Sequence, residues 1–226
     1  MKSRNGMIAL GLVGSMCLLG AAALTTSADQ GQKEKNKQRG KDRAEQRGTQ
    51  QAMPSEDEMM QAWMEFGAPN EHHALLEKFV GNWQLESTYW MAPGAPAETS
   101  VSYSEAKIIM GGRYLSEEVK GEMEMPGGET MQFQGSALVG YDNAKKMYFS
   151  YWIDNFSTSV FIEWGSINEK GQLITKGSMF NPMYGKETKT KSTVTFVDDN
   201  TRTLEMWMEH PEEGMFKHME ITYTRQ

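Results

Sequence analysis

The sequence predicts a mainly β protein, an antiparallel meander barrel of about ten strands that is preceded by two short α-helices. Between residues 82 and 225, apolar and polar side chains alternate in short runs, as they do in strands with one buried face. Glycine, proline, asparagine and aspartate separate these runs. No connection is long enough to hold a crossover helix, so neighbouring runs are expected to pair antiparallel.

Two helices are expected before the first strand. Ser55 followed by Glu58 forms a capping box, which marks the start of a helix that continues to Phe66. Asn70 is the expected cap of a second helix, which Gly81 ends. The apolar stripe of this second helix consists of Leu75, Leu76, Phe79 and Val80.

A meander of this size avoids open sheet edges by closing into a barrel. Barrels of about eight strands already hold one small ligand, and ten strands enclose more space. The sequence therefore predicts a cavity, or a mouth that is open at one end. The expected strands are 82–91, 98–110, 113–125, 129–141, 146–154, 156–166, 171–180, 186–197, 202–210 and 215–225.

Residues 1–28 are interpreted as a signal peptide. Lys2 and Arg4 precede an apolar stretch over 7–24, and small residues follow it, with cleavage expected after Ala23 or Ala28. A single membrane anchor is the alternative, because the stretch is close to the ~18 residues that a spanning helix needs. Cleavage would give an exported protein, periplasmic or extracellular, without stable membrane insertion of the mature chain. The only cysteine, at position 17, would leave with the signal, so no disulfide or thiolate is expected.

Residues 29–52 have a different composition. They contain no apolar residue larger than alanine, so they are expected to form a disordered, charged linker ahead of a domain over 53–226. Residues 1–52 carry nine basic and four acidic residues, a net charge of +5, which leaves −12 on the rest of the chain. The linker is interpreted as a solvated spacer. The alternative is that its positive charge contacts anionic surfaces or nucleic acid. The acidic domain argues against nucleic acid as the main partner.

Period-two alternation predicts which side chains face the interior. Aromatic residues and methionines are frequent at these positions, which suits a small apolar or aromatic molecule as the partner. Trp90, Trp152 and Trp207 fall on the opposite parity and are expected outside or at a rim. The predicted ligand-binding residues are Tyr89, Tyr103, Phe133, Phe149, Tyr151, Trp164, Met206, Met208 and His210.

Gly81-Asn82-Trp83, at the start of the first strand, resembles the Gly-x-Trp signature of lipocalin and calycin barrels. In those folds the tryptophan closes one end of the barrel under an arginine of the last strand. The resemblance therefore implies a calycin-like barrel in which Trp83 and Arg225 provide the closure.

A second resemblance covers about residues 70–226 and concerns the domain of unknown function 1579 family, which is bacterial and often exported. That family has no established activity, so the resemblance implies a barrel but no catalytic residues. The segments that carry it are Leu75 to Trp83, Gly111 to Leu115, Gly140 to Lys146, Trp152 to Asp154 and Glu220 to Arg225.

Methionine is unusually frequent. Of 19 methionines, 16 would remain after removal of the signal peptide. Core filler and the wall of an adaptable apolar pocket are two interpretations. The third is a soft-metal site, because Met206-x-Met208-x-His210 offers donors that suit Cu(I), as does the Met123-x-Met125 pair. Same-face neighbours lie about 7 Å apart along a strand, so convergence would need a bulge.

The remaining histidines and the carboxylates give weaker candidates. His210 or His218 could ligate haem, although His218 shares parity with residues expected to point outward, and His72 and His73 are expected on a helix surface. Otherwise no cofactor is expected. The chain has no nucleophile elbow, HExxH pair or phosphate loop, and Gly111-Gly112 lies in a turn.

The leading hypothesis is therefore non-covalent binding of a small apolar or aromatic ligand by a monomer or weak dimer. An enzyme with an acid/base pair inside the barrel, a copper or haem protein, and a scaffold are the alternatives.

Overall fold

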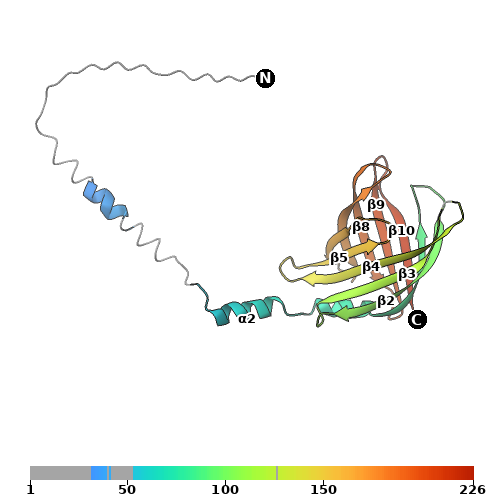
Figure 1. The fold of residues 1–226 in the computed structure, drawn as a ribbon. Helices are drawn as coiled ribbons and strands as arrows, with labels where there is room; N and C mark the ends of the chain where they lie inside the picture. Colours follow the sequence, from blue (N-terminus) through green and yellow to red (C-terminus); the bar gives the residue numbers. More distant parts are fainter. Residues whose placement is uncertain (1–31, 40, 42–52, 126) are drawn as a thin grey trace, which may run out of the picture. The chain divides into compact units, whose positions relative to one another are not determined.

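The computed structural model describes residues 32–39, 41, 53–125 and 127–226. The chain divides into two units, residues 1–55 and 56–226, and the second contains a single sheet of ten strands. Each strand pairs antiparallel with its neighbour in sequence, and β1 pairs with β10, so the sheet is a closed barrel (Figure 1). The predicted meander barrel is confirmed.

The strand boundaries agree closely with the predicted runs. The strands are β1 (Gly81–Tyr89), β2 (Glu98–Ile109), β3 (Tyr114–Glu124), β4 (Thr130–Asp142), β5 (Met147–Asp154), β6 (Phe161–Ile167), β7 (Leu173–Asn181), β8 (Lys186–Phe196), β9 (Thr201–His210) and β10 (Gly214–Arg225).

The largest difference is at β6, which begins at Phe161 rather than at residue 156. Asp154 Oδ1 accepts hydrogen bonds from the backbone N–H groups of Phe156 (3.0 Å) and Ser157 (2.9 Å). These bonds form a local turn that competes with the strand ladder.

The helices agree with the prediction in position and differ in type. Helix α2 (Glu56–Phe66) is an α-helix, whereas the second element, η1 (His73–Phe79), is a 3₁₀ helix. The N–H of Val80 bonds to the carbonyl of Glu77, three residues earlier, as in a 3₁₀ turn. Runs of 3₁₀ helix longer than three or four residues are uncommon. The seven residues of η1 keep this winding with His73, Leu76 and Phe79 buried, one residue in every three.

Part of the predicted linker also differs from expectation. Residues 32–39 form a helix in which every residue is exposed. Lysine, glutamate, glutamine and arginine dominate this segment, and all four have high helix propensity. The predicted signal peptide and the rest of the linker lie outside the described residues. Among the described residues, no helix has both the length and the apolar character needed to cross a bilayer.

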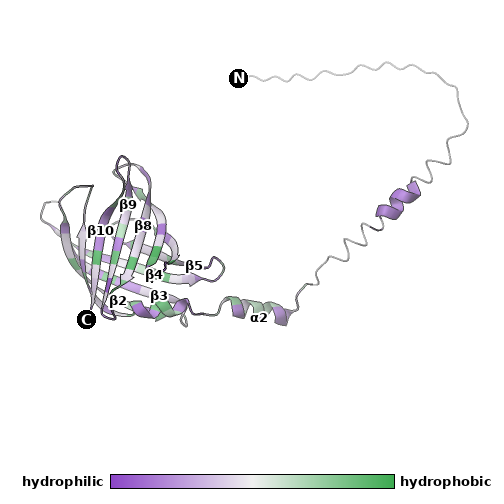
Figure 2. Cartoon of the chain, turned by 180° about the vertical axis from the view of Figure 1, so that it is seen from behind, coloured by the Kyte–Doolittle hydropathy of each residue, from purple (hydrophilic) through white to green (hydrophobic). Residues whose placement is uncertain are grey.

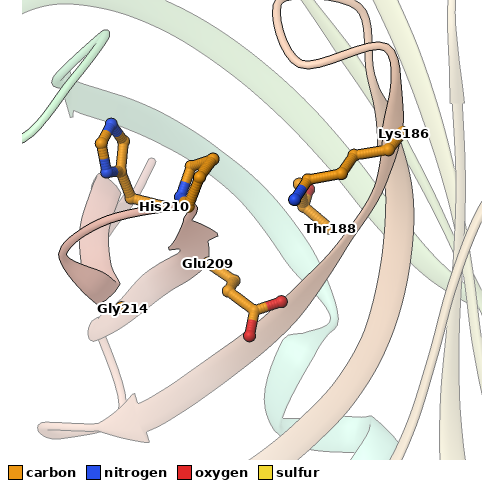
Figure 3. Close-up of a pocket in the computed structure, with 6 residues that line it drawn as sticks. Lys186, Thr188, Glu209, His210 and Gly214 are labelled. Atoms are coloured by element: carbon orange, nitrogen blue, oxygen red, sulfur yellow. The ribbon is translucent and has the colours of Figure 1, made fainter.

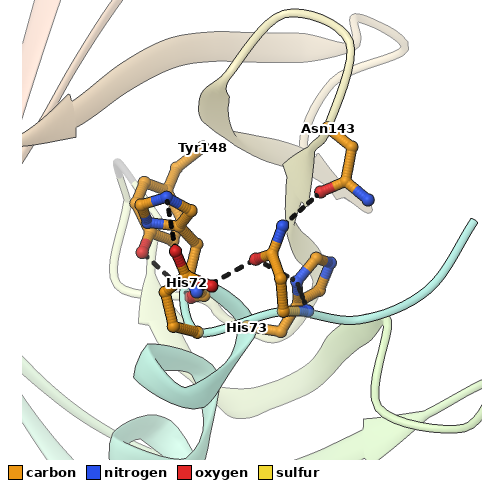
Figure 4. Close-up of polar contacts among 6 residues, drawn as sticks. His72, His73, Asn143 and Tyr148 are labelled. Atoms are coloured by element: carbon orange, nitrogen blue, oxygen red, sulfur yellow. Dashed lines mark hydrogen bonds and ion pairs between the residues drawn. The ribbon is translucent and has the colours of Figure 1, made fainter. Parts of the chain in front are cut away.

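Helix η1 covers the end of the barrel at which β1 begins. Leu76 and Phe79 are buried there, and Phe79 supplies the carbonyl that accepts a 2.8 Å hydrogen bond from Trp83 Nε1. Polar contacts hold the entrance to η1 (Figure 4). Tyr148 donates to the carbonyl of His72 (2.9 Å), and Asn143 accepts from the side-chain amide of Asn70 (2.8 Å). This end of the barrel is sealed.

A buried ion pair lies in the sealed end. Arg202 Nη2 is 2.7 Å from Glu117 Oε1, which also accepts a 2.7 Å hydrogen bond from Ser104. The guanidinium carbon of Arg202 lies 4.0 Å from the ring centroid of Tyr223, 4.7 Å from that of Phe79 and 4.8 Å from that of Trp83. Burial next to Glu117 raises the pKa of Tyr223. The faces of these aromatic rings interact favourably with the Arg202 cation, which is buried from solvent.

Removal of one member of this pair is expected to destabilise the fold strongly. Glu117→Gln leaves the Arg202 charge buried without its carboxylate, which should cost about 3–5 kcal/mol of unfolding free energy. Urea denaturation measures this loss. Because Lys189 and Glu209 form an exposed pair, Glu209→Gln is the control and should change stability little. Equal effects of the two substitutions would contradict the role assigned to the buried pair.

Candidate functional site

The ladder register shows which side chains face the barrel interior, because residues opposite each other share a face. Glu117 is buried and lies opposite Ala137, which in turn lies opposite Trp152. Trp152 therefore faces the interior, contrary to its predicted outer position. Its indole Nε1 donates a 2.8 Å hydrogen bond to Asp154 Oδ2.

Four predicted ligand-binding residues lie on the outer face instead. Phe149 and Tyr151 alternate with the inward Trp152, and Trp164 lies opposite Phe149. Tyr103 is 56% exposed and alternates with the buried Ser104. The assignments on β5 and β6 were wrong by one residue because the more apolar face of these strands points outward, whereas Ser150, Asp154 and Glu163 point inward. The alternation alone therefore does not identify the inner face.

The other five predicted residues share the inner face. Tyr89 lies opposite Met219, and the ring of Phe133 stacks on Trp152 at a centroid distance of 6.3 Å. The remaining three are Met206, Met208 and His210 on β9.

Gly135 was the signal for Trp152 that the sequence analysis missed. A Cβ atom at Gly135, two residues from the Ala137 that lies opposite Trp152, would lie 2.3 Å from the Trp152 ring, so the ring needs a glycine at this position of β4. A glycine inside a strand commonly marks such a close approach.

The interior has a sealed half and an open half. In the sealed half, inward side chains such as Trp83 and Leu85 are each 2% exposed. The guanidinium carbon of Arg225 lies 4.2 Å from the centroid of the Trp83 ring, at the position where barrel closure was expected.

In the open half, toward the ends of β1 and β9, several inward side chains of β5, β9 and β10 remain partly exposed although they point away from the outer surface, whereas Asn181, Thr188 and Thr190 are buried. Such exposure indicates unfilled space inside the barrel. The partly exposed residues are Ser150, Trp152, Met206, Met208, Phe216 and Met219.

Two cavities lie at this open end. One, of about 240 Å³, is bordered by the first residues of β8 and by the β9–β10 hairpin (Figure 3). Its lining includes Lys186, Thr188 and His210. The other, of about 320 Å³, lies between the β1–β2 connection and β10, where Trp90 and Phe216 line it.

The hydrogen bonds of His210 and Met208 argue against the predicted Met206–Met208–His210 metal set. His210 Nδ1 accepts from the backbone N–H groups of Glu212 and Glu213, both at 3.3 Å. Met208 Sδ accepts from Asn181 Nδ2 at 3.2 Å. Two of the three donors are therefore engaged in local contacts.

A β-bulge places His218 differently from expectation. The register between β9 and β10 shifts between Lys217 and Met219, so His218 is an extra residue in the ladder. Its ring lies 6.4 Å from that of the inward-facing Phe216. Within the described part of the chain, His218 Nε2 is buried without a hydrogen-bond partner, and burial lowers the pKa of this histidine to about 4. The expected outward orientation of His218 was wrong because the bulge breaks the alternation.

Two buried carboxylates also face the interior. Glu117 is paired with Arg202, whereas Glu163 accepts 2.8 Å hydrogen bonds from the hydroxyl groups of Thr175 and Thr190. Both glutamates are less than 10% exposed, at 6% and 2%. Their hydrogen bonds to neighbouring side chains suit a structural role. Over the ranges that the structure describes, no three His, Cys, Asp or Glu side chains group as a metal site.

Comparison with family models identifies the relationship of this barrel. The model described as protein of unknown function (DUF1579) matches residues 68–225. The chain belongs to this family. The match spans the sealed end, the open half and both cavities, so the candidate site lies within the family's shared domain. A search of curated proteins gives no match.

Two solved structures show a similar arrangement of strands. An S-type phycobiliprotein lyase, CPES, from Guillardia theta has 11% identity and a TM-score of 0.47, with 69% of this chain and 92% of that chain covered. A redesigned β-barrel has 13% identity and a TM-score of 0.34, with 67% and 94% covered. Neither similarity carries an argument about the ligand.

The buried His218 is expected to make stability depend on pH. The unfolded state takes up a proton near pH 6.5 and the folded state near pH 4, so stability is full above pH 6.5 and falls as the pH drops toward 4. This shift corresponds to about 3 kcal/mol. Urea denaturation at several pH values should show that His218→Gln removes this part of the pH dependence. His72→Gln, at a side chain that is 45% exposed, should retain it. An unchanged profile for His218→Gln would contradict the assignment.

Proposed function

We propose that the protein binds a small apolar, ring-containing molecule non-covalently in the open half of the barrel. The observation that carries this proposal is the contrast between the two halves of the interior. Inward side chains such as Trp83, Leu85 and Leu115 are buried at the end that η1 covers, whereas inward side chains of β5, β9 and β10 are partly exposed toward the opposite end. A pocket that is open on one side and closed on the other suits a ligand that enters end-on.

The lining of the open half supports an apolar ligand. Met206, Met208 and Met219 share this wall with the stacked rings of Phe133 and Trp152. Methionine is flexible and polarisable, so such a wall adapts to ligands of different outline. The buried side chains of Glu117, Glu163 and Arg202 already have polar partners inside the barrel, so we expect a ligand with little net charge.

The proposed setting of this binding is outside the cytoplasm. The basic and apolar features of residues 1–28 support export, and the mature chain would carry the binding domain as a monomer or weak dimer.

The interior Trp152 and the exterior Trp164 provide a matched test of ligand position. The neutral probe 1-aminoanthracene is expected to bind and to accept excitation energy from tryptophan. Trp152→Phe should lower this sensitised emission, because Trp152 faces the cavity and phenylalanine preserves the stacking on Phe133, while Trp90 remains as a donor at the second cavity. Trp164→Phe, on the outer face, should lower the emission less. Absence of probe binding, or equal loss in both variants, would overturn the proposal.

A Cu(I) site is the second candidate function. Met206 and Met219 lie opposite each other across the β9–β10 ladder, and His218, whose Nε2 has no hydrogen-bond partner among the described residues, directly precedes Met219 in the bulge. Thioether and imidazole donors are those that Cu(I) prefers. The low pKa of His218 keeps this nitrogen unprotonated at neutral pH, as metal binding requires.

Competition with a Cu(I)-specific chelator tests this candidate. Met219→Leu keeps the size of the side chain and should weaken Cu(I) binding roughly tenfold or more. Met147→Leu, on the outer face of β5, is the control and should have no effect. Tight Cu(I) binding that is unchanged in Met219→Leu and in His218→Gln would exclude this site. A Soret band in the isolated protein would indicate haem instead.

A further inference from the structure

An apolar surface covers the outside of β5 and β6. We call it the outer apolar face and define it by Phe149, Tyr151 and Ile153 on β5 with Ile162 and Trp164 on β6. Phe149 lies opposite Trp164, and Tyr151 lies opposite Ile162. Ile153 is 40% exposed and Ile162 is 41% exposed. Because the outside of a barrel is usually polar, a continuous apolar surface of this kind marks an interaction site.

Helix α2 carries exposed apolar side chains that could cover such a surface. None of its residues is buried, and Met60, Trp63 and Met64 are 63%, 70% and 69% exposed. Figure 2 shows that apolar and hydrophilic residues both contribute to this helix. Met59, Trp63 and Phe66 follow the spacing of one helical face. A helix of 11 residues is only marginally stable in water unless it packs on something.

The C-terminal end of α2 is held close to the start of the outer apolar face. Asn143 Nδ2 donates to the carbonyl groups of Phe66 (2.7 Å) and Ala68 (3.0 Å). Asn143 belongs to the β4–β5 turn, so only a few residues separate this anchor from Phe149.

Helix α2 and the outer apolar face have similar lengths along β5. Eleven residues of α-helix span about 16 Å, and the distance along β5 from Phe149 to Ile153 is about 13 Å. With its C-terminal end at the β4–β5 turn, α2 can therefore cover β5 from Met147 to Tyr151, about 13 Å further along the strand, and so most of the outer apolar face.

Charges at the anchored end also complement each other. Lys145 and Lys146 lie in the β4–β5 turn, and the Lys145 Nζ lies 3.6 Å from the centroid of the Trp164 ring. The C-terminal end of a helix carries partial negative charge and Glu65 adds to it, while α2 has no basic residue in its last turn. The two lysines would supply the missing positive charge.

We propose that α2 packs its apolar face on the outer apolar face of its own barrel. The occupant is the helix of the same chain, because the anchor at Asn143 raises its local concentration at this surface. This interaction lies on the opposite side of the sheet from the proposed ligand site and does not depend on it.

Engineered cysteines test this packing in the full chain with Cys17→Ser, which removes the natural thiol. Met60→Cys with Ile162→Cys should form an intrachain disulfide under mild oxidation. The control is Met60→Cys with Val101→Cys, because Val101 is 49% exposed on the outer face of β2. We expect at least tenfold more intrachain cross-linking for the first pair, measured by non-reducing electrophoresis and intact mass.

The other outcomes overturn the proposal. Covalent dimers would assign the outer apolar face to the α2 of a second copy, and equal cross-linking of both pairs would show a freely moving helix. A second measurement does not depend on the chosen cysteine positions. The emission of Trp63, obtained as the difference between wild type and Trp63→Phe, should shift to longer wavelength in Ile162→Glu. An unshifted emission would contradict the packing even if Ile162→Cys did cross-link.

Discussion

The cation of Arg202 at the sealed end of the barrel is the feature on which the rest of the structure depends. Its charge is matched by Glu117 on β3, and the rings of Phe79, Trp83 and Tyr223 surround it. These partners come from η1, β1, β3 and β10, so one side chain connects the covering helix to both sides of the ladder that closes the barrel. Because the side chains of the sealed half are closely packed, the interior of the other half can remain unfilled. The packing of the sealed half thus stabilises a barrel that has cavities at its open end.

The open half differs from the sealed half in chemistry as well as in packing. Methionines and aromatic rings predominate there, and the ionisable groups sit deeper or at the rim. The bulge at His218 is the main irregularity of this wall. His218, the residue before Met219, carries a buried ring nitrogen that has no partner among the described residues. The proposed ligand binding and the proposed Cu(I) binding would therefore both use the inward residues of β9 and β10, and they differ in whether His218 takes part.

The sequence was sufficient for the barrel, its strand order and most strand boundaries, because turn residues and alternation are local signals. It was sufficient for the inner face only where the opposite face is mostly polar, as on β9, where Glu205 and Glu209 flank the inward methionines. On β5 and β6 the outer face is apolar too, so Phe149, Tyr151 and Trp164 were assigned to the wrong side. His218 was misassigned for another reason, since a bulge depends on the pairing of two strands and leaves no mark in either strand alone. The 3₁₀ winding of η1 likewise depends on its packing against the barrel.

The apolar side chains of β5 lie on both of its faces, since Tyr148 and Trp152 point inward while Phe149, Tyr151 and Ile153 point outward. The hydrophobic pattern of β5 therefore does not by itself define how this strand aligns with β4. The preceding turn is one element that contributes to the alignment. Asp142 Oδ1 accepts from the N–H groups of Ala144 and Lys145, and Lys146 adopts a φ of 53° before the strand begins. The turn over residues 142–146 thus helps to set which aromatic side chains of β5 face the interior and which face the outside.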